Sequence, residues 1–280
     1  MDFVDLTPIL GFFAFWTGAS IASFLNVVIW RVPRGESIVS PPPSHCPKCN
    51  APIRWWQNVP ILSWLALRGR CANCRAPISP RYIVVETIGA LLFLAVAWVF
   101  LPSVSEVLFL WIWCSLMLVG SVIDFDHKLL PDFVTVGGMV LGVAKALADS
   151  ALMLVYGVDR VAAWLMPVAW SLSGLVFGFG LLWLVRFIGS KAFKREAMGM
   201  GDVFLMGAVG ALFGPVAVLF TLIVSSVLGS VAGLSLVALA KTKFGRFLEI
   251  PYGPYICAAC AVWIFFGPEI VNWYLGVMGV

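Results

Sequence analysis

The chain has 280 residues, of which 61% are hydrophobic and only 11% are charged, and its mean hydropathy is +1.00. A soluble domain carries about 25% charged residues, so this composition excludes a soluble globule. It also excludes a disordered chain and a disulfide-rich secreted scaffold, because the apolar content is high and seven cysteines are few for this length. The sequence therefore predicts an all-α membrane protein in a lipid bilayer, and nothing in it indicates nucleic-acid binding.

Eight apolar runs are predicted as membrane-spanning helices, because about 20 apolar residues cross a hydrocarbon core of roughly 30 Å. They cover residues 8–30, 82–101, 105–123, 132–149, 161–188, 202–213, 215–240 and 253–279. The first follows Asp2 and Asp5 instead of a basic segment, so we interpret it as a retained span and not a signal peptide. Residues 1–30 thus form a first helix, 31–81 a polar insertion, and 82–280 a core of about seven helices. No internal repeat is evident.

The basic residues predict the orientation of these helices. Sixteen of the eighteen Lys and Arg residues lie on alternate loops, and the exceptions are Lys145 and Arg160. Loops rich in Lys and Arg stay on the cytoplasmic side. The odd-numbered loops are therefore predicted to be cytoplasmic and both termini periplasmic.

The insertion contains two CxxC pairs, Cys46 with Cys49 and Cys71 with Cys74, separated by 21 residues. Two such turns supply the four thiolates of a tetrahedral zinc site. Reduced thiols without a metal are the alternative, and disulfides are less favoured in a reducing compartment. Because about 50 residues have little core of their own, zinc would stabilise the fold of the insertion.

Acidic residues gather at two membrane boundaries. One segment, DFDHKLLPD, carries Asp124, Asp126 and Asp132, and a second, MGMGD, carries Asp202. The predicted topology places both segments on the cytoplasmic side, where Asp124 and Asp202 can act as joint acid and base on a water molecule. Asp126 has a simpler interpretation as a solvated group or a partner of Lys128, and Asp132 as a helix cap.

Two glycines, Gly199 and Gly201, precede Asp202. They would let a substrate backbone approach the carboxylate closely. They could instead allow close packing between helices.

Several segments together resemble the type IV prepilin peptidases, and they occur in the family's order over nearly the whole chain. These are GASIASFLNVVIWRVP at 18–33, the two CxxC pairs, SPRYIVVE at 79–86, DFDHKLLPD at 124–132, MGMGD at 198–202 and IPYGPYI at 250–256. The resemblance implies an intramembrane aspartic endopeptidase of the GxGD type, with Asp124 and Asp202 as catalytic residues and Asp126, Asp132, Gly199 and Gly201 as supporting ones.

The same resemblance implies the substrates and the cofactors. The substrates would be type IV prepilins or pseudopilins of pilus and type II secretion systems, cut after a glycine on the cytoplasmic face of the bacterial inner membrane. Members with the cysteine loop also N-methylate the new N-terminus with S-adenosylmethionine, so a bifunctional enzyme with structural zinc is expected. Glu86 could hold a substrate amine or pair with Arg81. Phe204 departs from the family, which commonly has a lysine there.

Two other functions fit some of these residues. One is a GxGD protease that acts on a different class of membrane protein. The other is a proton-coupled transporter, for which acids or broken helices near the middle of the bilayer would be expected.

Overall fold

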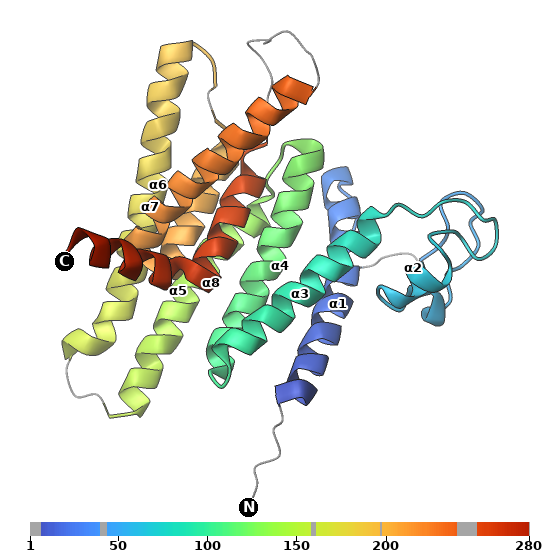
Figure 1. Ribbon diagram of the computed structural model, residues 1–280, viewed down its shortest axis with the longest axis horizontal. Coiled ribbons are helices and arrows are strands. Elements are labelled where there is room, and N and C mark those ends of the chain that lie inside the picture. Colours follow the sequence, from blue (N-terminus) through green and yellow to red (C-terminus); the bar gives the residue numbers. More distant parts are fainter. Residues whose placement is uncertain (1–6, 40–43, 158–160, 197, 240–250, 280) are drawn as a thin grey trace, which may run out of the picture. The chain divides into compact units, whose positions relative to one another are not determined.

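The computed structural model describes residues 7–39, 44–157, 161–196, 198–239 and 251–279. Seven helices in this part of the chain are long and apolar enough to cross a membrane (Figure 1). They are α1 (Thr7–Arg31), α3 (Arg81–Phe100), α4 (Val104–His127), α5 (Asp132–Val155), α6 (Val161–Phe193), α7 (Met200–Leu239) and α8 (Gly253–Met278). The chain forms two compact units, Met1–Val119 and Gly120–Val280, whose boundary lies within α4.

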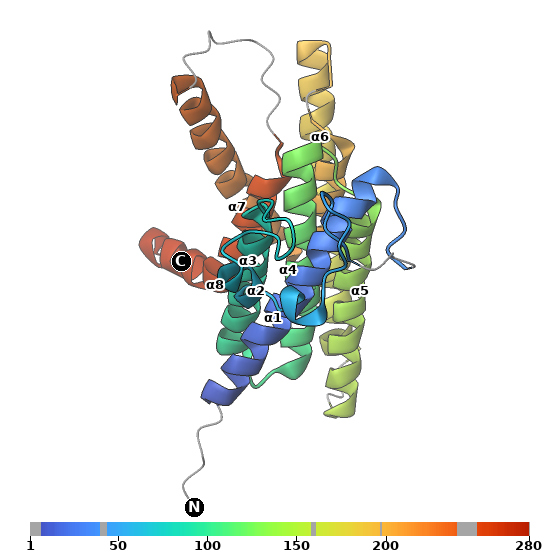
Figure 2. The same ribbon diagram turned by 90° about the vertical axis from the view of Figure 1, so that its right-hand side faces the viewer.

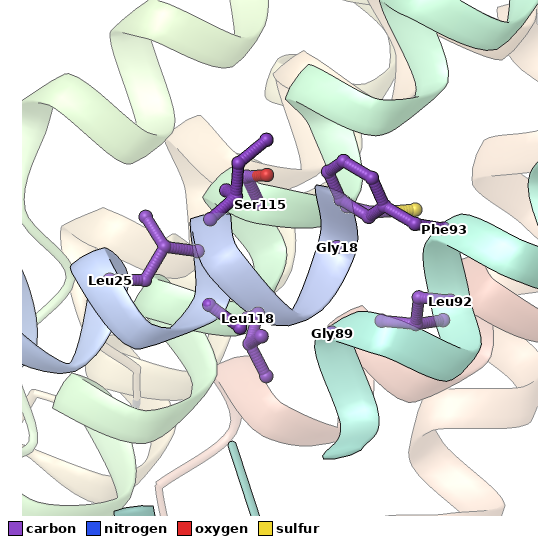
Figure 3. Close-up of a pocket in the computed structure, with 10 residues that line it drawn as sticks. Gly18, Leu25, Gly89, Leu92, Phe93, Ser115 and Leu118 are labelled. Atoms are coloured by element: carbon purple, nitrogen blue, oxygen red, sulfur yellow. The ribbon is translucent and has the colours of Figure 1, made fainter. Parts of the chain in front are cut away.

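The first unit is built on close contact between α1 and α3. A Cβ atom at Gly89 of α3 would lie 2.5 Å from the Cβ of Ala22, and one at Gly18 of α1 would lie 2.6 Å from the Cβ of Phe93. Figure 3 shows these two glycines beside Phe93 and Leu118, around a small pocket that has no space for a water molecule. The pocket is therefore part of the helix packing.

Three short helices lie in the polar insertion of the first unit, between α1 and α3 (Figure 2). They are η1 (Val32–Arg34), η2 (Trp55–Asn58) and α2 (Leu62–Ala66). Ser63 Oγ of α2 donates a hydrogen bond of 3.0 Å to the carbonyl of Trp56 in η2, which holds the last two together.

In the second unit α7 is sharply bent at Gly214. This residue has φ 83° and ψ −178°, and Pro215 follows it. Met206 and Val218, on opposite sides of the bend, both contact the position that a Cβ would take at Gly178 of α6. The two parts of α7 therefore fold back beside each other as two arms, 200–213 and 215–239.

The predicted spans agree with these helices. The sixth and seventh predicted spans are the two arms of α7, separated at the Gly-Pro pair where the sequence analysis divides them. The other helices begin and end within a few residues of their predicted limits except α5 and α6, which extend further at their C-terminal ends. Some charges used for the topology lie outside the described residues, namely Asp2, Asp5, Arg160, Lys241, Lys243 and Arg246.

Candidate functional site

The four predicted zinc ligands form one cluster in the insertion. Their Sγ atoms all lie within 4.8 Å of one another, and the Sγ atoms of Cys46 and Cys74 are 3.8 Å apart. Zn–S bonds of about 2.3 Å in a tetrahedron put the sulfur atoms about 3.8 Å apart. The cluster therefore has the donor type, number and spacing that suit a structural zinc ion.

Backbone and amide N–H groups point at these sulfur atoms. The N–H of Ala51 and the side-chain amide of Asn73 lower the pKa of Cys49 to about 6. The N–H of Ala76 lowers the pKa of Cys74, but burial and the three neighbouring thiols raise it to about 11. The raised pKa of Cys74 shows that four negative charges at this spacing would repel one another without a cation. A bound Zn²⁺ would remove that repulsion.

The two cysteine turns are copies of each other, which corrects the expectation that the chain has no repeat. The segments CPKCNAPI at 46–53 and CANCRAPI at 71–78 share the pattern CxxCxAPI. In each turn the first cysteine N–H donates to the carbonyl of Ala51 or Ala76, at 3.0 Å and 2.8 Å. The fifth residue of each turn has a positive φ, 54° at Asn50 and 59° at Arg75.

Asp124 lies in the last turn of α4 and is buried, with 6% of its surface exposed. Its Oδ2 atom accepts a hydrogen bond of 3.0 Å from the backbone N–H of Gly253, the first residue of α8. An N–H at a helix N-terminus favours a negative charge on the group that it contacts. Gly253 was not among the predicted site residues, although the segment IPYGPYI contains it.

Asp202 lies in the first turn of α7 and is 7% exposed. The N–H of Gly199 donates to its carboxylate, which is close enough to Asp124 for the two groups to interact electrostatically. The Oδ1 atom of Asp202 is buried and has no hydrogen-bond partner among the described residues. A buried oxygen without a donor is an unfavourable place for a negative charge.

Leu130 packs between Gly201, which precedes Asp202, and Gly253, which donates to Asp124. A Cβ at Gly201 would be 2.8 Å from the Cβ of Leu130, and a Cβ at Gly253 would be 3.3 Å from its Cδ1. For Gly201 the structure thus supports the interpretation of close packing. A Cβ at Gly199 would meet Asp202 Oδ2 at 3.5 Å, an ordinary contact distance. Sequence reasoning did not identify Leu130, because its sequence surroundings do not distinguish it from other buried leucines.

The two remaining acids of the first motif are exposed. Asp126 is the second-last residue of α4, and Asp132 is the first residue of α5. Pro131, and not Asp132, is the N-cap residue of α5, and Asp132 lies in the first turn. Both acids are thus at the surface, unlike Asp124 and Asp202.

Glu86 has a backbone partner that the sequence did not suggest. It is 7% exposed, and its Oε2 atom accepts a hydrogen bond of 2.7 Å from the backbone N–H of Ile61. Ile61 immediately precedes α2 and has an unusual positive φ of 62°. Glu86 therefore attaches the insertion to α3.

Phe204, at the position where the family commonly has lysine, packs on Phe179 of α6 with ring centroids 5.5 Å apart. A cation of α6, Arg186, instead contacts residues that precede Asp202. Arg186 Nε donates to the carbonyl of Met198 at 3.0 Å, and its Nη2 is 3.1 Å from Glu196 Oε1. Arg186 thus holds the segment before Asp202, a role that its place at the end of an apolar helix did not suggest.

Both units match protein-family models. Residues 16–100 match the bacterial peptidase A24 N-terminal domain, and residues 111–234 match the type IV leader peptidase family. A prepilin leader peptidase/N-methyltransferase of Pseudomonas putida is 33% identical over 99% of this chain and 95% of its own length. The chain belongs to the type IV leader peptidase family. No solved structure matches it.

Two other leader peptidases/N-methyltransferases extend the comparison. That of Xanthomonas campestris is 35% identical over 100% of both chains, and that of Myxococcus xanthus is 38% identical over 86% of this chain and 67% of its own. The leader peptidase match contains Asp124 and Asp202, and the N-terminal match contains the four clustered cysteines and Glu86. Gly253 lies beyond both matched segments.

Proposed function

We propose that this chain is a prepilin leader peptidase and N-methyltransferase of the bacterial inner membrane. It removes the basic leader of type IV prepilins or pseudopilins after a glycine, on the cytoplasmic face, and methylates the new N-terminus. The observation that carries the proposal is the buried pair Asp124 and Asp202, held at the ends of two helices within one compact unit. The names of the full-length relatives support the substrate class.

The unequal surroundings of the two acids suggest a role for each. Asp124 receives an N–H at a helix N-terminus and holds the negative charge, whereas Asp202, with its buried Oδ1, holds a proton. Asp124 accepts a proton from a water molecule as the water oxygen bonds to the scissile carbonyl carbon, and Asp202 donates its proton to the carbonyl oxygen. The carbon–nitrogen bond then breaks as the leaving amine receives a proton from Asp124 and one hydroxyl of the intermediate returns a proton to Asp202, which restores both acids.

The positions of the acids favour proteolysis at a membrane surface over proton transport. Asp124 is three residues before the end of α4, and Asp202 is the third residue of α7. A transporter would carry its acids near the middle of the bilayer. A prepilin whose apolar helix is in the membrane presents its cleavage site at this boundary, and the exposed Asp126 and Asp132 would attract its basic leader.

The names of the full-length relatives support a methyltransferase activity, and we place it in the N-terminal unit, which holds the cysteine cluster. S-adenosylmethionine would supply the methyl group, which passes to the amine of the cleaved pilin. Zinc on the four cysteines would cross-link the insertion and fix its two turns. Both termini are placed in the periplasm, because the basic insertion is then cytoplasmic.

The decisive experiment is to incubate the purified protein with a synthetic prepilin and follow the product by intact mass. Loss of the leader should precede the gain of one methyl group. Asp124→Asn and Asp202→Asn should each lower kcat for cleavage about 10²- to 10⁴-fold, the range for loss of a general acid or base. The exposed Asp126→Asn is the matched control, with kcat retained and KM raised for the basic leader. Near-normal cleavage by either dyad variant would refute the assignment.

A further inference from the structure

The insertion exposes large apolar side chains on two of its short helices, η2 and α2. In η2, Trp55 is 83% exposed and Trp56 is 47% exposed, and in α2, Leu62 and Leu65 are 51% and 54% exposed. We call these four side chains the Trp–Leu surface. Exposed apolar patches of this kind are typical of a surface that contacts a membrane or another protein.

The attachment to α3 sets the depth of this surface. Ile61, directly before α2, donates its N–H to Glu86, which is five residues after the start of α3. At 1.5 Å per residue, this contact lies about 7.5 Å along the helix from its cytoplasmic end. Because α3 has 20 residues and is thus about as long as the hydrocarbon core is thick, the start of α2 lies just inside the cytoplasmic edge of the core, at the depth of about 5–10 Å that interfacial helices reach. Both views show α2 beside the first turns of α3 (Figures 1 and 2).

The charges of the insertion complement an anionic bilayer. Residues 31–81 contain eight basic residues and one acid, Glu36, which gives a net charge of +7. The exposed cations are Arg34, Lys48, Arg54, Arg68, Arg70 and Arg75. Each Lys or Arg near an anionic leaflet adds to the attraction between the insertion and the bilayer. The same charge repels a basic peptide, so the leader of the proposed substrate is not the partner.

We infer that the Trp–Leu surface lies in the headgroup region of the cytoplasmic leaflet, with the insertion's cations on anionic lipid headgroups. Trp side chains prefer this interface, and short apolar helices bury their side chains about 5–10 Å into it. The hydrogen bond from Ile61 to Glu86 holds the insertion at the required depth. The cysteine cluster is thereby kept at the membrane surface instead of projecting into the cytosol.

Brominated lipids test this inference in the full-length protein in nanodiscs. The difference in emission between wild type and Trp55→Phe/Trp56→Phe reports the two tryptophans of the surface. Trp98→Phe is the matched reference, because Trp98 is 69% exposed near the other end of the spanning helix α3. Bromine near the headgroups should quench the Trp55 and Trp56 emission at least half as strongly as that of Trp98, and aqueous iodide should quench it little. Retained zinc shows that the variants are folded.

Three outcomes would overturn the inference. Strong quenching by iodide with none by bromine would place the surface in water. No quenching by either would show that protein covers it, as in a contact between two copies of the chain. If replacing phosphatidylglycerol with neutral lipid leaves the bromine quenching of Trp55 and Trp56 unchanged, the anionic headgroups have no part in it. None of these results depends on peptidase activity.

Discussion

Adding a single methyl group at Gly253 should displace the carboxylate of Asp124 and leave the fold of the protein intact. The N–H of Gly253 bonds to Asp124 Oδ2 at 3.0 Å, and a Cβ added to this glycine would stand 2.7 Å from the same oxygen. Ordinary contact begins at 3.4 Å, so in Gly253→Ala the carboxylate must withdraw by roughly 0.7 Å or the start of α8 must move.

The expected loss follows from the hydrogen bond that this shift breaks. A hydrogen bond to a charged group contributes about 1.5–3 kcal/mol. If that energy holds the charge of Asp124 in place during cleavage, Gly253→Ala should lower kcat about 10- to 100-fold. Initial rates at saturating prepilin, read by intact mass, give this number directly.

The same helix offers a matched control. Gly276 of α8 has no atom within 4 Å of its added Cβ, so Gly276→Ala should cleave at the wild-type rate and be as stable or up to about 1 kcal/mol more stable, since alanine favours helix. Gly253→Ala should still methylate a pilin peptide that has already been cleaved. Cleavage by Gly253→Ala at the wild-type kcat would show that the contact with α8 does not control Asp124.

Two further variants test residues that act from a distance. Arg186→Gln removes the donor to the carbonyl of Met198 and should lower kcat for cleavage about 5-fold, for the loss of about 1 kcal/mol. Initial rates measure this effect, and Lys191→Gln on the exposed end of the same helix is the control. Equal rates for the two variants would exclude the role of Arg186. Cys46→Ser should lose the single zinc ion and most methylation, whereas Cys114→Ser, at a buried cysteine, should keep both. Metal analysis measures the zinc content, and methyl incorporation measures the second activity. A full zinc content in Cys46→Ser would exclude the four-cysteine site.

The sequence predicted those parts of the protein whose cause is local. The zinc cysteines follow from spacing within two short turns, and the division of α7 follows from Gly214 and Pro215, because glycine permits a positive φ and proline cannot continue the hydrogen-bond pattern. The copied CxxCxAPI turns were missed although both copies are visible in the sequence. The prediction considered the cysteines alone and not the Ala-Pro-Ile that follows them.

The contacts that complete the candidate site could not be predicted, because they join segments far apart in the chain. Gly253 bonds to Asp124 across 129 residues, and Ile61 bonds to Glu86 across 25. In both cases a backbone N–H is the donor, and any residue except proline carries one. The carboxylates could be recognised as candidates because charge is costly at a membrane boundary, but their partners have no distinguishing side chain.

The bend at Gly214 has a consequence for the synthesis of the enzyme. The first arm of α7, residues 200–213, is about 21 Å long at 1.5 Å per residue, too short to cross the hydrocarbon core alone. Asp202 should therefore reach its place only when the second arm enters the membrane with it as one hairpin. Asp124 then receives its hydrogen bond only after Gly253 and α8 have followed. With Asp124 and Asp202 as the proposed catalytic pair, proteolytic activity would therefore require that α8, the last helix described, is also in the membrane.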